Sequence, residues 1–404
     1  MVVMPKQNVP ALRLEGFSGE WELKAIGELF AERNESFPEG ELLSVTLRNG
    51  IKRFQEIGRH NTSNEDKSKY KLVEVGDIAY NSMRMWQGAS GVSPWKGIVS
   101  PAYTVLKPVG SQDTPFFAYY FKTPFMIQVF QLNSQGLTSD TWNLKYPALS
   151  AIDICRPQDI EEQQAIGAIF TNLDAAINQH TLKHKALQQS KTALMQRMFP
   201  QEGQTVPELR LEGFDGEWEE KRLVDEVSFF SGLTYTPSDV VEHDGTLVLR
   251  SSNVQDGVIA TKDCVYVRTD AVNVQNVRKN DIIMVVRNGS RSLIGKHAVV
   301  QKPMPSTVIG AFMTGIRSDQ PWFINALFDT GLFKYEVDKS MGATINQITG
   351  GMFAGMSFFF PPTLEEQQAI GAIFTKLDAL IAAEAQYIKS LSQAKTALLQ
   401  RMFI

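Results

Sequence analysis

Two segments of this chain occur twice, and the repeat constrains its architecture more than any other feature. Residues 9–21, VPALRLEGFSGEW, return at 206–218 with 11 of 13 positions identical. Residues 161–199 return at 365–403 with 26 of 39 positions identical. The stretches between these frames resemble each other only faintly. A duplicated frame that carries two different inserts predicts one architecture used twice, for two related but different tasks.

The length of the chain supports the same division. With 404 residues it is longer than one ordinary hydrophobic core supports, so two domains with connecting segments are expected. The expected segments are a first domain over residues 1–160, a long helix over 161–199, a linker over 200–218 that repeats the N-terminal segment, a second domain over 219–364, and a second long helix over 365–404.

The longer repeat carries apolar residues at seven-residue spacing, which predicts a helix with a coiled-coil stripe. Each copy follows a proline and opens with a Glu-Glu pair, which suits the positive end of the helix dipole. At about 1.5 Å per residue, such a helix is about 58 Å long. We therefore expect two helices that pair antiparallel and hold the inserts apart. The expected seam consists of Ile166, Phe170, Leu173, Ile177, His184, Leu187, Leu194, Ile370, Phe374, Leu377, Ile381, Glu384, Ile388, Leu391 and Leu398.

Polar residues interrupt this seam near its midpoint. If the pair is centred on its own symmetry, His184 lies opposite Glu384 and His180 opposite Ile388. A polar pair in an apolar seam can fix the register, whereas histidines on a loosely packed stretch simply face solvent. Both interpretations stay open. His180 and His184 have the i, i+4 spacing of metal ligands, but no third ligand is apparent, so no metal site is predicted.

The two inserts share a pattern of short strands and polar loops. Residues 73–91 (VEVGDIAYNSMRMWQGASG) and 277–295 (VRKNDIIMVVRNGSRSLIG) each indicate a turn with an acidic residue, an apolar strand and a loop rich in Arg, Ser, Asn and Gly. An earlier strand and turn, at 42–54 and 247–259, and a later Gly-x-Thr turn also recur. The apolar run 352–360 is short enough to be a buried strand. These patterns predict mixed α/β domains dominated by short strands.

Charge is distributed unevenly along the chain. The net charge is −4, which by itself argues against a nucleic-acid ligand. Residues 42–155, however, hold twelve Lys/Arg and eight Asp/Glu, a net of +4, and residues 228–360 hold twelve and eleven, a net of +1. Basic charge gathered on one face would attract phosphate, whereas a solvated surface is the alternative. The sequence shows no secretion signal or membrane-spanning segment, and its two cysteines have no partner motif, so a cytoplasmic protein is expected.

Taken together, these features resemble the DNA-specificity subunit of type I restriction-modification systems. The resemblance rests on the PxLRLxGFxGEW entry, the GDI strand, the Gly-x-Thr turn, and above all the doubled EEQQAIGAIF helix with its KTALxQRMF ending. It implies two target recognition domains, each reading one half of a split double-stranded DNA sequence, and helices that set the gap. It also implies docking of two methyltransferase subunits, with restriction and translocase subunits joining through them. Asn280 departs from the pattern by replacing the glycine of the second GDI turn.

Direct reading of bases favours Arg for guanine and Asn or Gln for adenine, whereas Lys, Ser and Thr more often bind the phosphate backbone. Three tryptophans, Trp86, Trp95 and Trp142, could stack on bases, although a buried aromatic is the commoner arrangement. The candidate DNA-binding residues are Arg48, Asn49, Lys52, Arg53, Asn81, Ser82, Arg84, Thr138 and Ser139 in the first domain, and Arg250, Ser252, Asn253, Arg287, Asn288, Ser290, Arg291, Lys296, Thr344, Asn346 and Gln347 in the second.

Motifs for catalysis are missing from the sequence. It has no Asn/Asp-Pro-Pro-aromatic motif of an adenine methyltransferase and no phosphate-binding loop of the G-x-x-x-x-G-K-[ST] type. Five dispersed histidines offer no obvious triad. We therefore predict no catalytic activity and no cofactor for the isolated chain. Two other classes remain open: a coiled-coil scaffold without sequence-specific DNA reading, and an enzyme whose site forms only between the two inserts.

Overall fold

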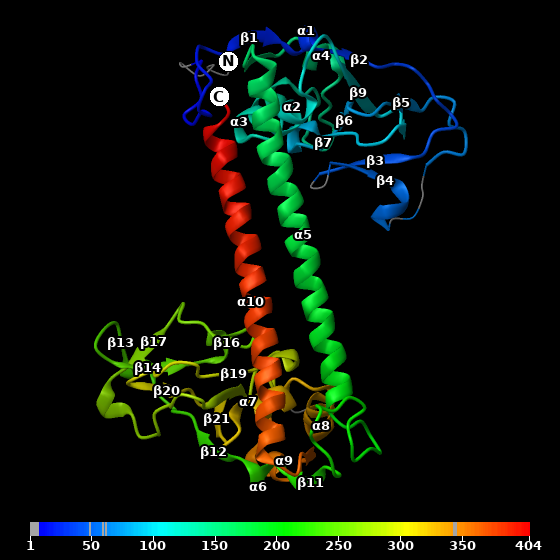
Figure 1. The fold of residues 1–404 in the computed structure, drawn as a ribbon. Coiled ribbons are helices and arrows are strands. Elements are labelled where there is room, and N and C mark those ends of the chain that lie inside the picture. Colours follow the sequence, from blue (N-terminus) through cyan, green and yellow to red (C-terminus); the bar gives the residue numbers. More distant parts are fainter. Residues whose placement is uncertain (1–7, 48–49, 59, 61–62, 342–345) are drawn as a thin grey trace. The chain divides into compact units, whose positions relative to one another are not determined.

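The computed structural model describes residues 8–47, 50–58, 60, 63–341 and 346–404 (Figure 1). It divides into two compact units, the first made of Met1–Thr181 with Gln386–Ile404, and the second of Leu182–Ala385. Each unit thus joins one insert to the beginning of the long helix that follows it and to the end of the other long helix. The unit boundaries fall inside the two long helices, whereas the sequence suggested whole helices as separate segments.

The first unit is built on a four-stranded antiparallel sheet in the order β2-β9-β6-β7. The strand pairs β1-β10, β3-β4 and β5-β8 are also antiparallel. The strands are β1 (Glu22–Ala25), β2 (Phe30–Glu32), β3 (Leu43–Thr46), β4 (Gly50–Arg53), β5 (Lys71–Val73), β6 (Ile78–Asn81), β7 (Ser90–Val92), β8 (Gly97–Val99), β9 (Tyr103–Pro108) and β10 (Asp153–Arg156). The helices are α1 (Ile26–Leu29), α2 (Thr114–Tyr120), α3 (Pro124–Asn133), α4 (Tyr146–Ser150) and the beginning of α5 (Ile160–Met198).

The second unit repeats the antiparallel sheet, in the order β12-β21-β18-β19, and adds a mixed sheet β13-β17-β14-β20 in which β14 and β20 are parallel. Two antiparallel pairs, β11-β22 and β15-β16, accompany them. The strands are β11 (Glu219–Arg222), β12 (Ser228–Ser231), β13 (Val240–Val241), β14 (Thr246–Leu249), β15 (Val254–Gln255), β16 (Val258–Ile259), β17 (Val265–Val267), β18 (Ile282–Val285), β19 (His297–Val299), β20 (Thr307–Ile309), β21 (Met313–Arg317) and β22 (Ser357–Phe360). The helices are α6 (Leu223–Glu226), α7 (Pro321–Phe328), α8 (Gly331–Met341), α9 (Gly350–Ala354) and the beginning of α10 (Leu364–Arg401).

The two antiparallel sheets correspond strand for strand, and the GDI strands β6 and β18 occupy the same internal position in each. The predicted fold class, mixed α/β with an internal repeat, is confirmed. One local expectation was wrong. The apolar run 352–360 is not a single strand, because α9 ends at Ala354 and β22 begins only at Ser357. The sequence patterns also did not reveal the helices that follow β9 and β21.

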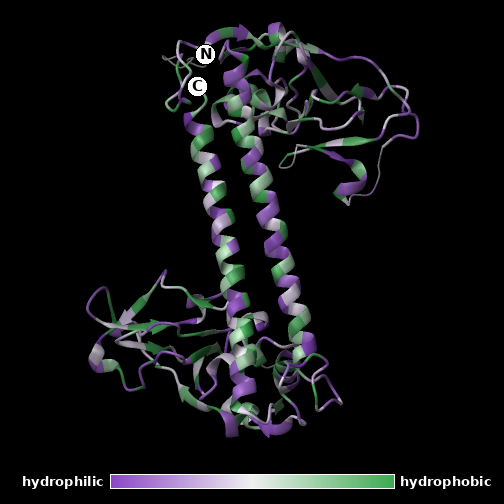
Figure 2. Ribbon diagram, viewed as in Figure 1, coloured by the Kyte–Doolittle hydropathy of each residue, from purple (hydrophilic) through white to green (hydrophobic). Residues whose placement is uncertain are grey.

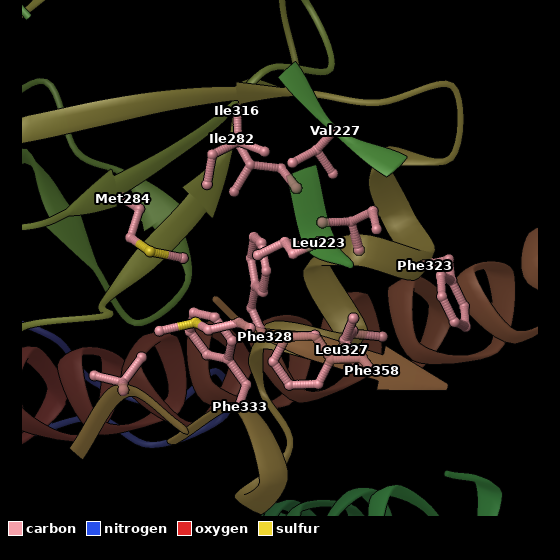
Figure 3. Close-up of a cluster of buried hydrophobic side chains, with 14 of the residues drawn as sticks. Leu223, Val227, Ile282, Met284, Ile316, Phe323, Leu327, Phe328, Phe333 and Phe358 are labelled. Atoms are coloured by element: carbon pink, nitrogen blue, oxygen red, sulfur yellow. The ribbon is translucent and has the colours of Figure 1, made fainter. Parts of the chain in front are cut away.

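Those helices supply much of the hydrophobic core. In the second unit Phe328 and Phe333 have ring centroids 4.4 Å apart, and Phe333 lies 6.0 Å from Phe358 of β22. Figure 3 shows these side chains gathered with Ile282 and Leu223 in one cluster. Deleting any such buried aromatic would leave a cavity, at a typical cost of about 3–5 kcal/mol. This core fixes the end of β18 from which the polar loop leaves.

The repeated entry segment is explained by a buried ion pair. Arg13 Nε and Nη2 donate to both carboxylate oxygens of Glu162, at 2.9 and 2.8 Å, and Arg210 does the same to Glu366 at the same two distances. Both arginines also donate to backbone carbonyls of their own GFxGEW turn. The second glutamate of each Glu-Glu pair therefore anchors the entry segment to the start of a long helix.

The entry segments also receive the ends of the long helices. The Leu12 N–H donates to the Arg401 carbonyl at 2.8 Å, and the Leu209 N–H donates to the Arg197 carbonyl at 2.8 Å. The first described residues and the last residues of the chain consequently lie side by side in the first unit (Figure 1). Each entry segment supplies a donor to carbonyls that an isolated helix end would leave without partners.

Within each unit, segments of α5 and α10 pair antiparallel. In the first unit Lys395 Nζ lies 2.5 Å from Asp174 Oδ1, while farther along α5 the His180 ring lies 4.5 Å from that of Tyr387. In the second unit Lys191 Nζ lies 2.6 Å from Asp378 Oδ1. Partner numbers fall along α10 as they rise along α5, which is the antiparallel order.

The fifteen expected seam residues are all buried or half-buried. The His180 ring contacts that of Tyr387, which is next to Ile388 in the chain, and buried Glu384 forms an ion pair with Lys183, which is next to His184. The expected pairings of His180 with Ile388 and of His184 with Glu384 stay predictions. The long stem of a lysine lets its charged end reach a buried carboxylate from the edge of the seam. Figure 2 shows hydrophobic and hydrophilic residues interleaved along both helices.

Among the described residues, no helix combines the length and the apolar character that crossing a membrane requires.

Candidate nucleic-acid interface

The aspartate of each GDI motif shapes the turn before its strand. Asp77 and Asp281 are both only 2% exposed, and each carboxylate accepts the N–H three residues earlier, at 2.8 and 2.7 Å. The residue before each aspartate is left-handed, with φ of 89° at Gly76 and 73° at Asn280. Asparagine tolerates this region better than most residues, so the turn has the same form in both copies despite the replacement of glycine.

An arginine neutralises each of these buried carboxylates. Arg33 donates to Asp77 at 2.7 and 3.1 Å, and Arg317 donates to Asp281 at 2.8 and 3.1 Å. The hydrogen bond to Asp77 raises the pKa of Arg33. The two arginines come from different places, one just after β2 and the other at the end of β21. Both carboxylates are thus committed to the fold, and the loops after β6 and β18 leave from a rigid base.

In the first unit two further segments meet the loop after β6. The Leu144 N–H donates to the Ser82 carbonyl at 2.8 Å, which ties the segment that follows the Gly-x-Thr turn to this loop. The hairpin β3-β4 packs so closely on β7 that a Cβ on Gly91 would lie 2.8 Å from the Gly50 Cα. The three predicted polar segments are therefore held together by backbone contacts.

The second unit has the equivalent hydrogen bond. The Ile348 N–H donates to the Val286 carbonyl at 2.8 Å, at the positions that correspond to Leu144 and Ser82. Asn288 Nδ2 donates to Ser251 Oγ at 3.2 Å, and Asn346 Nδ2 approaches the Gly289 carbonyl at 3.4 Å. The early turn, the loop after β18 and the segment after the Gly-x-Thr turn therefore meet in this unit as well.

Some of the expected DNA-binding side chains are occupied in shaping these loops. Ser82 is buried and its Oγ donates to the Ala102 carbonyl at 2.7 Å. Asn253 is fully buried, and its amide bonds the Arg250 N–H and the Ala260 carbonyl at 2.9 and 3.0 Å. The structure assigns Ser82 and Asn253 to the hydrogen bonding of the loops themselves, which is a correction to the sequence expectation. Asn81 is half-buried, and its Oδ1 accepts the Met83 N–H at 3.1 Å.

Three of the expected arginines have acidic partners. Arg53 lies 3.4 Å from Glu41, Arg250 lies 3.3 Å from Asp263, and Arg291 lies 3.5 Å from Asp338. These pairs are partly exposed, so they are weak and screened by salt. The positive charges of these arginines are nevertheless partly cancelled, so they attract phosphate less strongly.

Four other expected cations keep their charge. No acidic side chain of the described residues lies within ion-pair distance of Lys52 or Arg84 in the first unit, or of Arg287 or Lys296 in the second. Arg84 and Arg287 are exposed, whereas Lys52 and Lys296 are half-buried. Each unit therefore presents one exposed arginine and one lysine of uncancelled charge from these converging segments.

The remaining expected residues are mostly accessible. Gln347 forms an isolated bridge with Arg287, which places the two beside each other. Arg48, Asn49 and Thr344 lie outside the described residues. The exposed members are Thr138, Ser139, Ser252, Ser290 and Asn346, and the half-buried ones are Asn288 and Gln347.

The three tryptophans near these loops are less buried than the sequence led us to expect. Trp86 and Trp142 are half-buried and form an edge contact with ring centroids 5.2 Å apart. Trp95 is also half-buried and lies under the guanidinium of Arg53. Two exposed apolar side chains went unnoticed in the sequence: Leu137, which is fully exposed, and Phe312, which is 54% exposed. Leu137 sits inside the quoted Gly-x-Thr turn, whereas Phe312 belongs to an apolar stretch that looks like core.

No group of three or more potential metal ligands occurs in the part of the chain that the structure describes.

A family model for the type I restriction modification DNA specificity domain matches the chain twice, over residues 18–188 and 216–393. The chain belongs to this family. Each match holds one complete insert together with most of the long helix that follows it, so the chain contains two copies of the specificity domain. The resemblance inferred from the sequence is confirmed.

Curated relatives match one part of the chain. The type I restriction enzyme EcoKI specificity subunit of Escherichia coli strain K12 and the StySPI specificity subunit of Salmonella potsdam are each 29% identical to it over 159 residues. That alignment covers 37% of this specificity-domain chain and 33% of each relative. It therefore spans about a third of the length of the curated relatives.

Solved structures match almost the whole fold. The S subunit of a type I restriction-modification system from M. genitalium superposes with a TM-score of 0.65 at 15% identity, covering 98% of this chain and 99% of the other. A chain from a study of complex assembly and conformational transition of the type I R-M system gives a TM-score of 0.50 at 16% identity, covering 95% and 97%. At these identities the similarity establishes the shared fold.

Proposed function

We propose that this chain is the non-catalytic DNA-specificity subunit of a type I restriction-modification complex. Each unit reads one half of a bipartite, asymmetric double-stranded DNA target. The long helices set the number of unread base pairs between the halves and dock two methyltransferase subunits, through which the restriction and translocase subunits join. The expected partners are thus DNA and other subunits, with no cofactor of its own.

One observation carries the proposal: equivalent loops converge in both units but present different side chains. The same backbone hydrogen bond, from Leu144 to Ser82 and from Ile348 to Val286, organises both sets of loops. On this shared frame the exposed arginine is Arg84 in one unit and Arg287 in the other, at loop positions that do not correspond: Arg84 comes three residues after the end of β6, and Arg287 two residues after the end of β18. A common frame with different polar groups is what reading two unlike half-sites requires, because base edges are distinguished by donor and acceptor pattern.

The experiment is methylome sequencing of cells that express this chain with its methyltransferase partner, beside cells with the partner alone. We expect a new two-part motif, of which only one half changes when one insert is exchanged for that of a relative. Arg84→Ala should relax one half-site only, by about 1–3 kcal/mol if the arginine binds a base edge. Arg53→Ala is the matched control, because the charge of Arg53 is already paired with Glu41.

A coiled-coil scaffold without DNA reading is the second candidate, and the nearly neutral second insert favours it. This alternative predicts that the methyltransferase binds the chain and is active but produces no new motif. A weakening by Arg84→Ala that is uniform across all sequences would instead assign that side chain to phosphate.

A further inference from the structure

Phe312 lies beside the loop that follows β18 in the second unit. It lies in the short link between β20 and β21, and its carbonyl accepts the N–H groups of both Val286 and Arg287, at 3.0 and 3.2 Å. Despite this fixed backbone its ring is 54% exposed. Single exposed apolar side chains are common on protein surfaces, so what distinguishes Phe312 is the guanidinium that stacks on its ring.

Arg287 stacks on this ring. Its guanidinium carbon lies 5.1 Å from the ring centroid, and the side chain has no acidic partner among the described residues. Arg250 and Arg291, by contrast, are paired with Asp263 and Asp338. Stacking uses the face of the guanidinium and leaves its in-plane N–H donors free. Arg287 is thus held in place with its hydrogen-bonding edge and its charge available.

The first unit lacks this pair. In the sheet register Val285 lies opposite Met313, and Asn81 opposite Tyr103. By this register the position of Phe312 corresponds to Ala102, and that of Arg287 to Met83. The stacked pair is therefore particular to the second reader.

Resting on the proposed function, we propose that Arg287 and Phe312 together read a guanine and a neighbouring thymine in the half-site of the second unit. The Arg287 guanidinium donates two hydrogen bonds to guanine O6 and N7, and the Phe312 ring packs against the C5 methyl group of thymine. Their separation of 5.1 Å exceeds one base step, about 3.4 Å along a strand, and is less than two. Two groups at this spacing can address adjacent base pairs in the major groove.

The test uses the full complex of this chain with its methyltransferase subunits and oligonucleotide duplexes that carry the motif found by methylome sequencing. Each thymine of the second half-site is replaced in turn by uracil, which keeps the base pairing and removes only the C5 methyl group. We expect one such position, next to a guanine, to weaken binding about 4-fold, as expected for one buried methyl-sized group. In Phe312→Ala the same replacement should have no effect.

Substitution of the neighbouring guanine should weaken binding of the parent protein about 5- to 150-fold, and Arg287→Ala should abolish that discrimination. Phe312→Leu keeps an apolar contact and should retain part of the uracil effect. Discrimination at the first half-site serves as the folding control, and it should be unchanged in all three variants.

Several results would overturn this assignment while leaving the proposed function intact: a second half-site without adjacent guanine and thymine, an absent uracil effect, or an effect of equal size in Phe312→Ala. Weaker assembly with the methyltransferase, without a change in base preference, would assign Phe312 to a protein contact instead. Absence of any sequence preference in the parent complex would reject the proposed function itself, and the inference with it.

Discussion

Removal of Arg210 should destabilise the second unit strongly. Its guanidinium makes two hydrogen bonds to Glu366, a side chain only 1% exposed, and it also donates to the Asp215 carbonyl at 2.6 Å. In Arg210→Ala the carboxylate of Glu366 remains buried without a partner. Breaking a buried pair in this way costs about 3–5 kcal/mol. For a unit of roughly 200 residues this corresponds to a fall in Tm of about 6–20 °C.

Differential scanning calorimetry of the purified chain measures this effect. Arg13→Ala is the matched variant, because Arg13 makes the same contacts to Glu162 in the first unit. Each substitution should lower the unfolding transition of its own unit. The double variant Arg210→Met/Glu366→Leu should recover most of the loss, since it removes the buried charge along with the pair. A loss below about 1 kcal/mol for Arg210→Ala would refute the view that Glu366 depends on this arginine.

Three further outcomes are expected. Burial raises the pKa of Tyr119, Tyr120 and Tyr80 above the ordinary value of 10.0. Their contribution to stability is fully present below about pH 10, and the first unit should lose stability as the pH rises above that value. Circular dichroism as a function of pH should show a smaller alkaline loss of stability for Tyr119→Phe than for the parent. Gly371→Ala should destabilise the second unit by about 1–3 kcal/mol in urea titrations, because its Cβ would lie 2.8 Å from the Phe323 nitrogen, whereas Gly331→Ala, with open space around it, should cost much less. Deletion of one heptad from each long helix should change the spacer length of the methylated motif or abolish modification, and continued modification at the original spacing would contradict the role of the helices as a ruler.

Much of the architecture follows from local patterns in the sequence. The duplicated frame determined the two-copy organisation, and the seven-residue spacing of apolar residues determined the long helices, with observed bounds of Ile160–Met198 and Leu364–Arg401. These features depend on neighbours a few residues apart, so periodicity reveals them. The alternation of strands and polar turns likewise identified β6 and β18, because a short apolar run between turn residues has few other uses.

The candidate interface was only partly visible in the sequence. Pattern placed the polar loops at comparable positions, and the equivalent hydrogen bonds to the Ser82 and Val286 carbonyls agree with that placement. The sequence pattern could not distinguish Asn253, whose amide is hydrogen-bonded within its own loop, from Asn346, whose side chain is exposed. Both are asparagines in turns, and only the three-dimensional surroundings decide whether a polar group already has partners.

The sequence alone therefore determined the repeat, the long helices, the order of the strand and loop motifs along the chain, and the family. Tertiary structure decided which charges remain uncancelled and which apolar groups face solvent. Glu162 and Glu366 looked like helix-dipole residues but are buried partners of arginines 149 and 156 positions away in the chain. Phe312 stands in an apolar stretch typical of a core, but its ring is exposed and Arg287 stacks on it. Such pairings depend on contacts between distant segments, which periodicity and spacing do not record.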